Sequence, residues 1–211
     1  EPPTDAGAPA FDEYVSDPAK PVPFTGETHP GMTYNYMVAD QRFASRRTDV
    51  LAYETEPLQG DVTVAGPIEC NLHVSTTGTD SDWVVKLVYV YPGNFPDPDP
   101  NPAGVRLGGY QQLVRGEPFR GRFRNGFEKA EPFQPGQVSK VAFVMPDVYH
   151  TFRRGHRIMV QVLSAWFPLI DRNPQRFVEI HKATEADFQK ATQRVYLSAQ
   201  FPSSVKVRVL P

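Results

Sequence analysis

Two aspartates, Asp80 and Asp82, stand directly before a long apolar run in the segment TGTDSDWVVKLVYVYPG, residues 77–93. Two carboxylates at this spacing can form a general acid/base pair, supply half of a calcium loop, or line the polar entrance of a buried strand. A calcium loop needs more oxygen ligands nearby, yet the residues after Asp82 are Trp, Val and Val. Aspartates at strand ends often accept hydrogen bonds from backbone N–H groups. We therefore interpret both acids as organisers of a loop.

The histidines offer a second possibility for chemistry. His150 and His156 flank the turn HTFRRGH, which could bring them together as metal ligands. Polar side chains in such turns usually bond to the turn's own backbone, and we favour that interpretation. The sequence contains no P-loop, no G-x-G-x-x-G and no H-E-x-x-H motif. We predict no metal site and no cofactor.

A nucleophile is also missing from the sequence. A serine hydrolase of the α/β class carries its serine in a G-x-S-x-G turn, and no serine here has that environment. Ser164 falls within an apolar strand pattern, where a hydroxyl usually bonds to the backbone. Cys70 is the single cysteine, and its apolar position indicates a small buried hydrophobe. We predict no catalytic residue, and a complete small enzyme is the least favoured interpretation.

The composition is that of a folded domain with a substantial core, because 40% of the 211 residues are hydrophobic and 12% are aromatic. The net charge of −2 provides no overall field for nucleic acid or an anionic membrane surface. No run of about 18 apolar residues occurs either. We predict neither nucleic acid nor membrane as a partner.

The elements that must position these residues are predicted to be strands. In IECNLHVS, residues 68–75, apolar side chains alternate with polar ones, which is typical of a half-buried strand. The segment 83–91 is apolar on both faces apart from Lys86, as expected for a central strand. Further strands are predicted at 119–126, 140–145, 157–167 and 204–210.

One short helix is predicted at 184–192, where Thr184 and Asp187 have capping-box-like spacing. No strand–helix–strand alternation appears. The pattern predicts an all-β fold, an antiparallel two-sheet sandwich and most naturally a jelly roll, over residues 32–211. Residues 1–31 are rich in proline and predict an extended arm or linker on its surface.

Two further segments hold candidate structural or interdomain residues. RRTDVLAYETEPL, residues 46–58, is expected to lead into the first sandwich strand, with a buried Arg47–Asp49 pair at its entry. In SAWFPLIDRNP, residues 164–174, Phe167 ends a strand and Asp171 begins a turn away from it. Together with Asp80 and Asp82, these residues complete the candidate positions.

The same segments resemble a known family. Several ordered motifs are similar to the C-terminal domain of X-Pro dipeptidyl-peptidases, cocaine esterase and α-amino acid ester hydrolases. They are RRTDVLAYETEPL, VAGPIECNLHVSTTGTDSDWVVKLVYVYP, PFQPGQVSKVAFVMPDVYHTFRRGHRI and LSAWFPLIDRNP. The resemblance runs from about Tyr34 to the C-terminus, and the α-amino acid ester hydrolases are the most similar branch. Tyr89 departs from the family pattern, where an acid is common.

The resemblance implies a galactose-binding-like jelly roll that packs beside the α/β-hydrolase catalytic domain of the same polypeptide. It implies a serine hydrolase acting on α-amino acid esters or amides, with acyl transfer to β-lactam antibiotics as a further option. It leaves a homo-oligomer open and favours a bacterial periplasmic or secreted location over the cytoplasm. The alternative is a carbohydrate- or ligand-binding jelly-roll module, for which Trp83, Trp166, Tyr91 and Tyr110 are the available aromatic residues.

Overall fold

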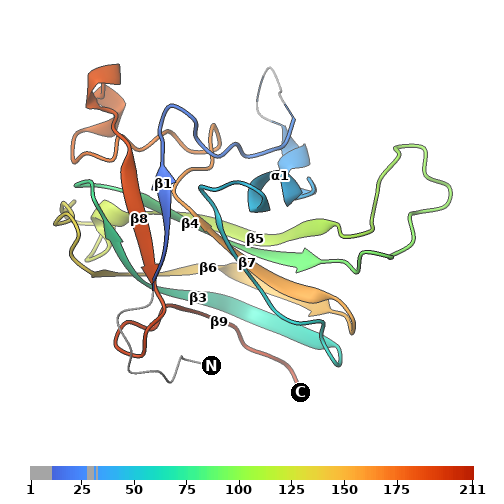
Figure 1. Cartoon of the computed structure of the whole chain (residues 1–211). Helices are drawn as coiled ribbons and strands as arrows, with labels where there is room; N and C mark the ends of the chain where they lie inside the picture. The colour runs from blue at the N-terminus through green and yellow to red at the C-terminus, as the bar shows by residue number, and fades with distance from the viewer. Residues whose placement is uncertain (1–10, 28–30, 32) are drawn as a thin grey trace.

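The computed structural model describes residues 11–27, 31 and 33–211, in which nine strands form two antiparallel sheets (Figure 1). The first sheet has the order β1 (Phe11–Ser16), β8 (Ala191–Tyr196), β3 (Val62–Thr76), β6 (Ser139–Phe152), and β9 (Ser204–Lys206) also pairs with β3. The second sheet has the order β2 (Leu51–Glu54), β7 (Arg157–Leu163), β4 (Asp82–Val90), β5 (Gln111–Arg120). The predicted all-β, two-sheet antiparallel sandwich is confirmed.

Helical structure in the described residues is limited to short pieces. The only α-helix among them is α1 (Arg42–Ser45), and the rest are single 3-10 turns. These turns are η1 (Tyr34–Met37), η2 (Gly121–Phe123), η3 (Ile180–Lys182) and η4 (Glu185–Asp187). No helix in the described part of the chain is long and apolar enough to cross a membrane.

The sandwich core follows the alternation in β3. Ile68, Cys70, Leu72 and Val74 are buried, while Glu69 between them is exposed. Burial raises the pKa of the Cys70 thiol to about 12, so this group stays protonated and unreactive. The core-facing side chains of β3 meet those of β4 in one hydrophobic cluster.

Strand β4 is buried along its whole length because both of its faces are covered. Its second face packs against a separate cluster that includes the arm residues Val22 and Phe24 together with Trp166. The backbone of the arm is fixed there, since Phe24 N–H donates to Phe167 O (2.8 Å) and Phe167 N–H donates to Val22 O (2.9 Å). Trp83 and Trp166 are both buried, so neither offers an open platform for a sugar.

Part of the expected arm belongs to the sandwich. Residues 11–16 form β1, an edge strand that pairs with β8 from Phe11↔Tyr196 to Ser16↔Ala191. The alternation in FDEYVS is too short to stand out beside a proline-rich flank, but Tyr14 and Ser16 are buried as in any half-buried strand. Residues 1–10, 28–30 and 32 of the predicted arm and sandwich lie outside the described residues.

Four predicted elements are shorter in the structure, among them the strand expected at 157–167, which is β7 and ends at Leu163. The helix expected at 184–192 is the single turn η4, which Thr184 begins by donating its backbone N–H to Asp187 Oδ2 (2.9 Å). The strand expected at 119–126 ends at Arg120, where η2 begins, and the strand expected at 204–210 ends at Lys206. Strand β5 ends where its partner β4 begins, since Arg120 pairs with Asp82, the first residue of β4. After Lys206 the chain keeps only an isolated bridge to β3, from Val209 to Val64.

Candidate functional site: a buried network of acids and arginines

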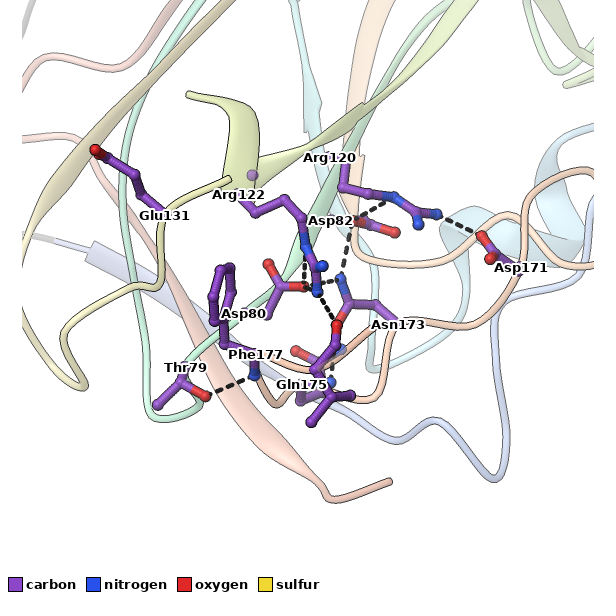
Figure 2. Close-up of polar contacts among 12 residues, drawn as sticks. Thr79, Asp80, Asp82, Arg120, Arg122, Glu131, Asp171, Asn173, Gln175 and Phe177 are labelled. Atoms are coloured by element: carbon purple, nitrogen blue, oxygen red, sulfur yellow. Dashed lines mark hydrogen bonds and ion pairs between the residues drawn. The ribbon is translucent and has the colours of Figure 1, made fainter. Parts of the chain in front are cut away.

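Asp80 and Asp82 come together with residues from three distant segments at one end of the sandwich. Asp82 opens β4, Arg120 closes β5, and Arg122 lies in the following turn η2. Asn173 belongs to the long loop between β7 and β8 (Figure 2). Both aspartates are essentially inaccessible to solvent.

Arg122 is the counter-charge of Asp80. Its Nε donates to Asp80 Oδ2 (2.9 Å), and its Nη2 donates to the same oxygen and to Val178 O (2.9 Å). The guanidinium carbon lies 4.9 Å from the ring centroid of Phe177, which covers it from the loop side. A buried carboxylate paired in this way is held by charge-assisted hydrogen bonds.

Asn173 joins the two acids through one amide group. Its Nδ2 donates to Asp80 Oδ2 (3.1 Å) and to Asp82 Oδ1 (2.9 Å), as Figure 2 shows. Its Oδ1 accepts a hydrogen bond from the backbone N–H of Gln175 (2.8 Å). All three polar groups of the Asn173 side chain are therefore engaged, which fixes the loop against the strand ends.

The negative charge of Asp82 is less fully balanced by a nearby arginine than that of Asp80. Arg120 Nε lies 3.5 Å from Asp82 Oδ1, and the same arginine also pairs with Asp171 at the surface. Burial raises the pKa of Asp82 to about 7, although Arg120 and Asn173 act in the opposite direction. The network thus runs from two buried acids to one exposed acid, Asp171.

The loop's backbone is locked by a close approach. Thr79 N–H donates to Gln175 O (3.1 Å), and Phe177 N–H donates to Thr79 Oγ1 (2.8 Å). Gln175 adopts φ +61°, and a Cβ added to Gly78 would lie 2.3 Å from the Gln175 carbonyl oxygen. Only glycine at position 78 leaves room for this contact.

This arrangement has the residue types of a catalytic site, but a substrate cannot reach them. A general acid or base must reach the proton of a substrate, whereas Asp80 and Asp82 are covered and their facing oxygens are already bonded. We interpret the network as a clamp that ties the loop 164–190 to the ends of β4 and β5. The two remaining carboxylate oxygens, Asp80 Oδ1 and Asp82 Oδ2, make no hydrogen bond to any described residue.

Arg47 and Asp49 form a second ion pair, away from this network. Arg47 Nε and Nη2 donate to Asp49 Oδ1 and Oδ2, each at 2.7 Å, and Nη2 also donates to Lys20 O (2.9 Å). We expected this pair to be buried, but it is only half-buried. Its guanidinium lies beside the exposed backbone of the arm. It connects the arm to the entry of β2.

The remaining candidates occupy separate places. Phe167 follows β7 and is partly exposed, with its backbone bonded to Val22 and Phe24 of the arm. His150 and His156 both contact the Tyr89 ring, with centroid distances of 5.0 and 4.6 Å. No cluster of three or more His, Cys, Asp or Glu residues suited to a metal ion exists within the ranges that the structure covers.

Sequence patterns alone did not identify Asn173, Arg122 or Lys86 as members of buried polar clusters. Asn173 is 91 residues from Asp82, and only the shared position at one end of the sandwich brings them together. The alternation of Arg with Phe and Gly in FRGRFRNG was the available signal for Arg122, since a charged residue among apolar ones needs a partner when buried.

Comparison with known proteins agrees with this architecture. Residues 2–206 match the family described as the X-Pro dipeptidyl-peptidase C-terminal non-catalytic domain. The cocaine esterase of Rhodococcus sp. (strain MB1 Bresler) is 33% identical over 205 residues, which are 97% of this chain and 33% of that protein.

Two solved structures share both sequence and fold with the chain. An aminopeptidase from a marine sediment Thaumarchaeota archaeon is 46% identical with a TM-score of 0.89, over 98% of this chain and 34% of that one. An α-amino acid ester hydrolase is 44% identical with a TM-score of 0.88, over 100% of this chain and 34% of that one. The chain therefore spans about a third of the length of these relatives.

Proposed function

The chain belongs to the family of X-Pro dipeptidyl-peptidase C-terminal non-catalytic domains, and from this premise we propose that it serves a serine hydrolase acting on α-amino acid esters or amides. In this proposal it packs against the α/β-hydrolase domain of the same polypeptide and supports it without supplying a catalytic group. The single observation that carries the proposal is that Asp80 and Asp82, the acids whose spacing could serve catalysis, are buried away from any substrate.

The names of the relatives favour an amino acyl substrate. The two solved structures at 46% and 44% identity are an aminopeptidase and an α-amino acid ester hydrolase, and both names specify an amino acyl group. The cocaine esterase is 33% identical. Each of these relatives is about three times as long as this chain. We therefore assign the catalytic residues of the whole protein to a part outside these 211 residues.

An apolar surface next to the arm supports the packing part of the proposal. The turn η1 contains no buried residue, and Tyr34 is 85% exposed, Met37 48% and the adjacent Val38 66%. Large apolar side chains that gather on a surface mark contact sites.

The turn is nevertheless firmly seated. Tyr36, between the exposed residues, packs its ring against Trp166 at a centroid distance of 5.8 Å, and Tyr110 OH donates a hydrogen bond to Val38 O. A seated segment with outward apolar side chains suits a fixed contact between domains better than a solvated loop.

The proposal is tested by joining the chain to the hydrolase part of its own polypeptide. We expect the 211-residue chain alone to show no turnover of an α-amino acid ester such as phenylglycine methyl ester, and the two parts produced together to copurify. Turnover by the isolated chain that is lost on replacing one of its own serines would overturn the proposal.

The contact surface has a matched control. The double substitution Tyr34→Ser/Met37→Ser should weaken copurification at least about tenfold, because it removes the exposed apolar side chains at the two ends of the turn η1. Tyr149→Ser removes a tyrosine that is 78% exposed on β6, and it should leave copurification unchanged. Equal loss in both variants, or none in either, would place the contact elsewhere.

A further inference from the structure

A cavity of about 320 Å³ lies at the end of the sandwich where β4 leaves the core. Its walls come from the end of β4, the base of the excursion 91–110, β6 and the turn between β6 and β7. The lining residues used below are Tyr89, Tyr91, Phe95, His150, Arg153 and His156. The volume is at the lower end of the range for small-molecule sites.

The turn that carries Arg153 and His156 has a fixed shape. His156 N–H donates to Arg153 O (3.1 Å), and Gly155 has φ +80°, as the third position of a type II turn requires. Gly155 N–H also donates to Leu58 O (2.8 Å), which ties the turn to the residues after β2. This turn therefore holds Arg153 and His156 at the same cavity.

The opposite wall is the base of the excursion. Tyr91 N–H donates to Tyr110 O (2.9 Å), and Phe95 N–H donates to Pro92 O (3.0 Å), so both rings sit on braced backbone. The ring centroids of Tyr91 and Phe95 lie 4.9 Å apart, at an interplanar angle of 87°. His156 completes the group at 5.0 Å from Tyr91 and 5.3 Å from Phe95.

Two imidazole nitrogens of the cavity-lining histidines have no hydrogen-bond partner among the described residues. His150 Nε2 and His156 Nδ1 are buried, and neither forms a hydrogen bond to a described residue. His156 as a whole is 96% buried, its exposed fraction being 4%. Burial lowers the pKa of both histidines, and the Arg153 charge lowers that of His156 further. Buried polar atoms without partners are rare in folded proteins, and both of these belong to side chains that line the cavity.

Arg153 supplies a positive charge that the described residues do not neutralise. It is exposed, and no described carboxylate forms an ion pair with it. The neighbouring Arg154, which does not line the cavity, has its backbone N–H bonded to Asp61 Oδ1 (2.8 Å). A guanidinium beside aromatic walls recognises a planar anion through charge-assisted hydrogen bonds and ring contact.

We propose that this cavity is a binding site for a small aromatic carboxylate, with the ring against Tyr91, Phe95 and His156 and the carboxylate at Arg153. This site is separate from the acid network at Asp80 and Asp82, and it does not depend on the packing of the chain against a hydrolase domain.

Benzoate is the probe that tests the site. We expect saturable binding of benzoate to the 211-residue chain by calorimetry and by ligand-observed NMR, with chemical-shift changes at the amides of Tyr91 and His156. Two analogues separate the contributions of charge and planarity. Benzamide, which is neutral, and cyclohexanecarboxylate, which is not planar, should each bind at least about tenfold more weakly.

Variants locate the site. Arg153→Gln should weaken benzoate binding roughly tenfold or more, while Arg154→Gln should leave it unchanged. Tyr91→Leu should weaken the binding of benzoate until it equals the binding of cyclohexanecarboxylate, because the preference for a planar ring is lost. Thermal melting of each variant checks that its fold is intact. The proposal is overturned if benzoate does not saturate, if Arg153→Gln binds as the parent does, or if galactose binds here and benzoate does not.

Discussion

Lys86 donates a hydrogen bond from Nζ to Gln41 Oε1 at 3.1 Å, and no described carboxylate pairs with its ammonium group. Both side chains are fully buried between β4 and the segment that contains α1. Two aromatic rings supply the other favourable contacts for the charge, with centroids 4.8 Å (Trp166) and 5.8 Å (Phe43) from Nζ. A buried cation in the centre of an apolar strand is therefore held by one amide and two aromatic faces.

The first prediction follows from the burial of Lys86, which lowers its pKa from 10.5 to about 7. Between these values the unfolded chain binds more protons than the folded one, so stability rises with pH from about 7 to 10.5, by up to about 1.4 kcal/mol per unit. Lys86→Met should remove this rise, as measured by urea unfolding at pH 7, 8 and 9. Lys140→Met removes an exposed lysine of β6 and should keep it. An unchanged slope in Lys86→Met would contradict the prediction.

The second prediction concerns Asp80. Asp80→Asn leaves the Arg122 guanidinium buried without its counter-charge, and this should lower the free energy of unfolding by roughly 3–5 kcal/mol. Chemical denaturation at pH 8 measures the change. A loss below about 1 kcal/mol would mean that Arg122 finds another partner, such as water at the edge of the loop.

Asp82 should respond differently, which is the third prediction. Its pKa is raised from 3.8 to about 7, so the folded chain binds more protons than the unfolded one in this window and stability falls as pH rises from 3.8 to 7. Asp82→Asn keeps an oxygen that can accept from Asn173, and it should change stability at pH 7 by less than about 1 kcal/mol. The fall between pH 4.5 and 7 should also become shallower. A larger loss than in Asp80→Asn would reverse our assignment of the two acids.

The fourth prediction concerns the close approach at Gly78. Gly78→Ala places a methyl group against the Gln175 carbonyl oxygen, and the resulting backbone shift should cost about 1–3 kcal/mol. Gly60→Ala is the control, because a Cβ there meets nothing within 4 Å. Thermal melting of the two variants compares them, and equal melting temperatures would show that the loop 173–178 yields easily.

Local patterns predicted much of the sandwich. The alternation in 68–75 identified the inward face of β3, and the apolar segment 83–91 identified β4 as a central strand. These predictions succeed because side chains alternate between the two faces of a strand whatever its neighbours are. The resemblance to the family, resting on several ordered motifs, is confirmed as well.

Contacts between distant segments were not predictable in the same way. Lys86 interrupts an apolar run, but the sequence does not indicate that Gln41, 45 residues earlier, meets it. The strand β1 was not predicted because it is stabilised by pairing with β8, near the other end of the chain. The cavity beside Tyr91 and His156 likewise forms only when the excursion and the turn after β6 are folded against each other.

The shared amide of Asn173 restricts the routes by which this sequence can diverge. Asn173 bonds to Asp80 and Asp82 together, so a change at position 173 alone leaves two buried carboxylates short of a donor. A change at Asp82 first is the milder step, since an amide there still accepts from Asn173. Asp80 and Arg122, by contrast, can be exchanged only as a pair, because either one alone is an unmatched buried charge. Descendants of this sequence should therefore lose the acid at position 82 before they lose either member of that pair.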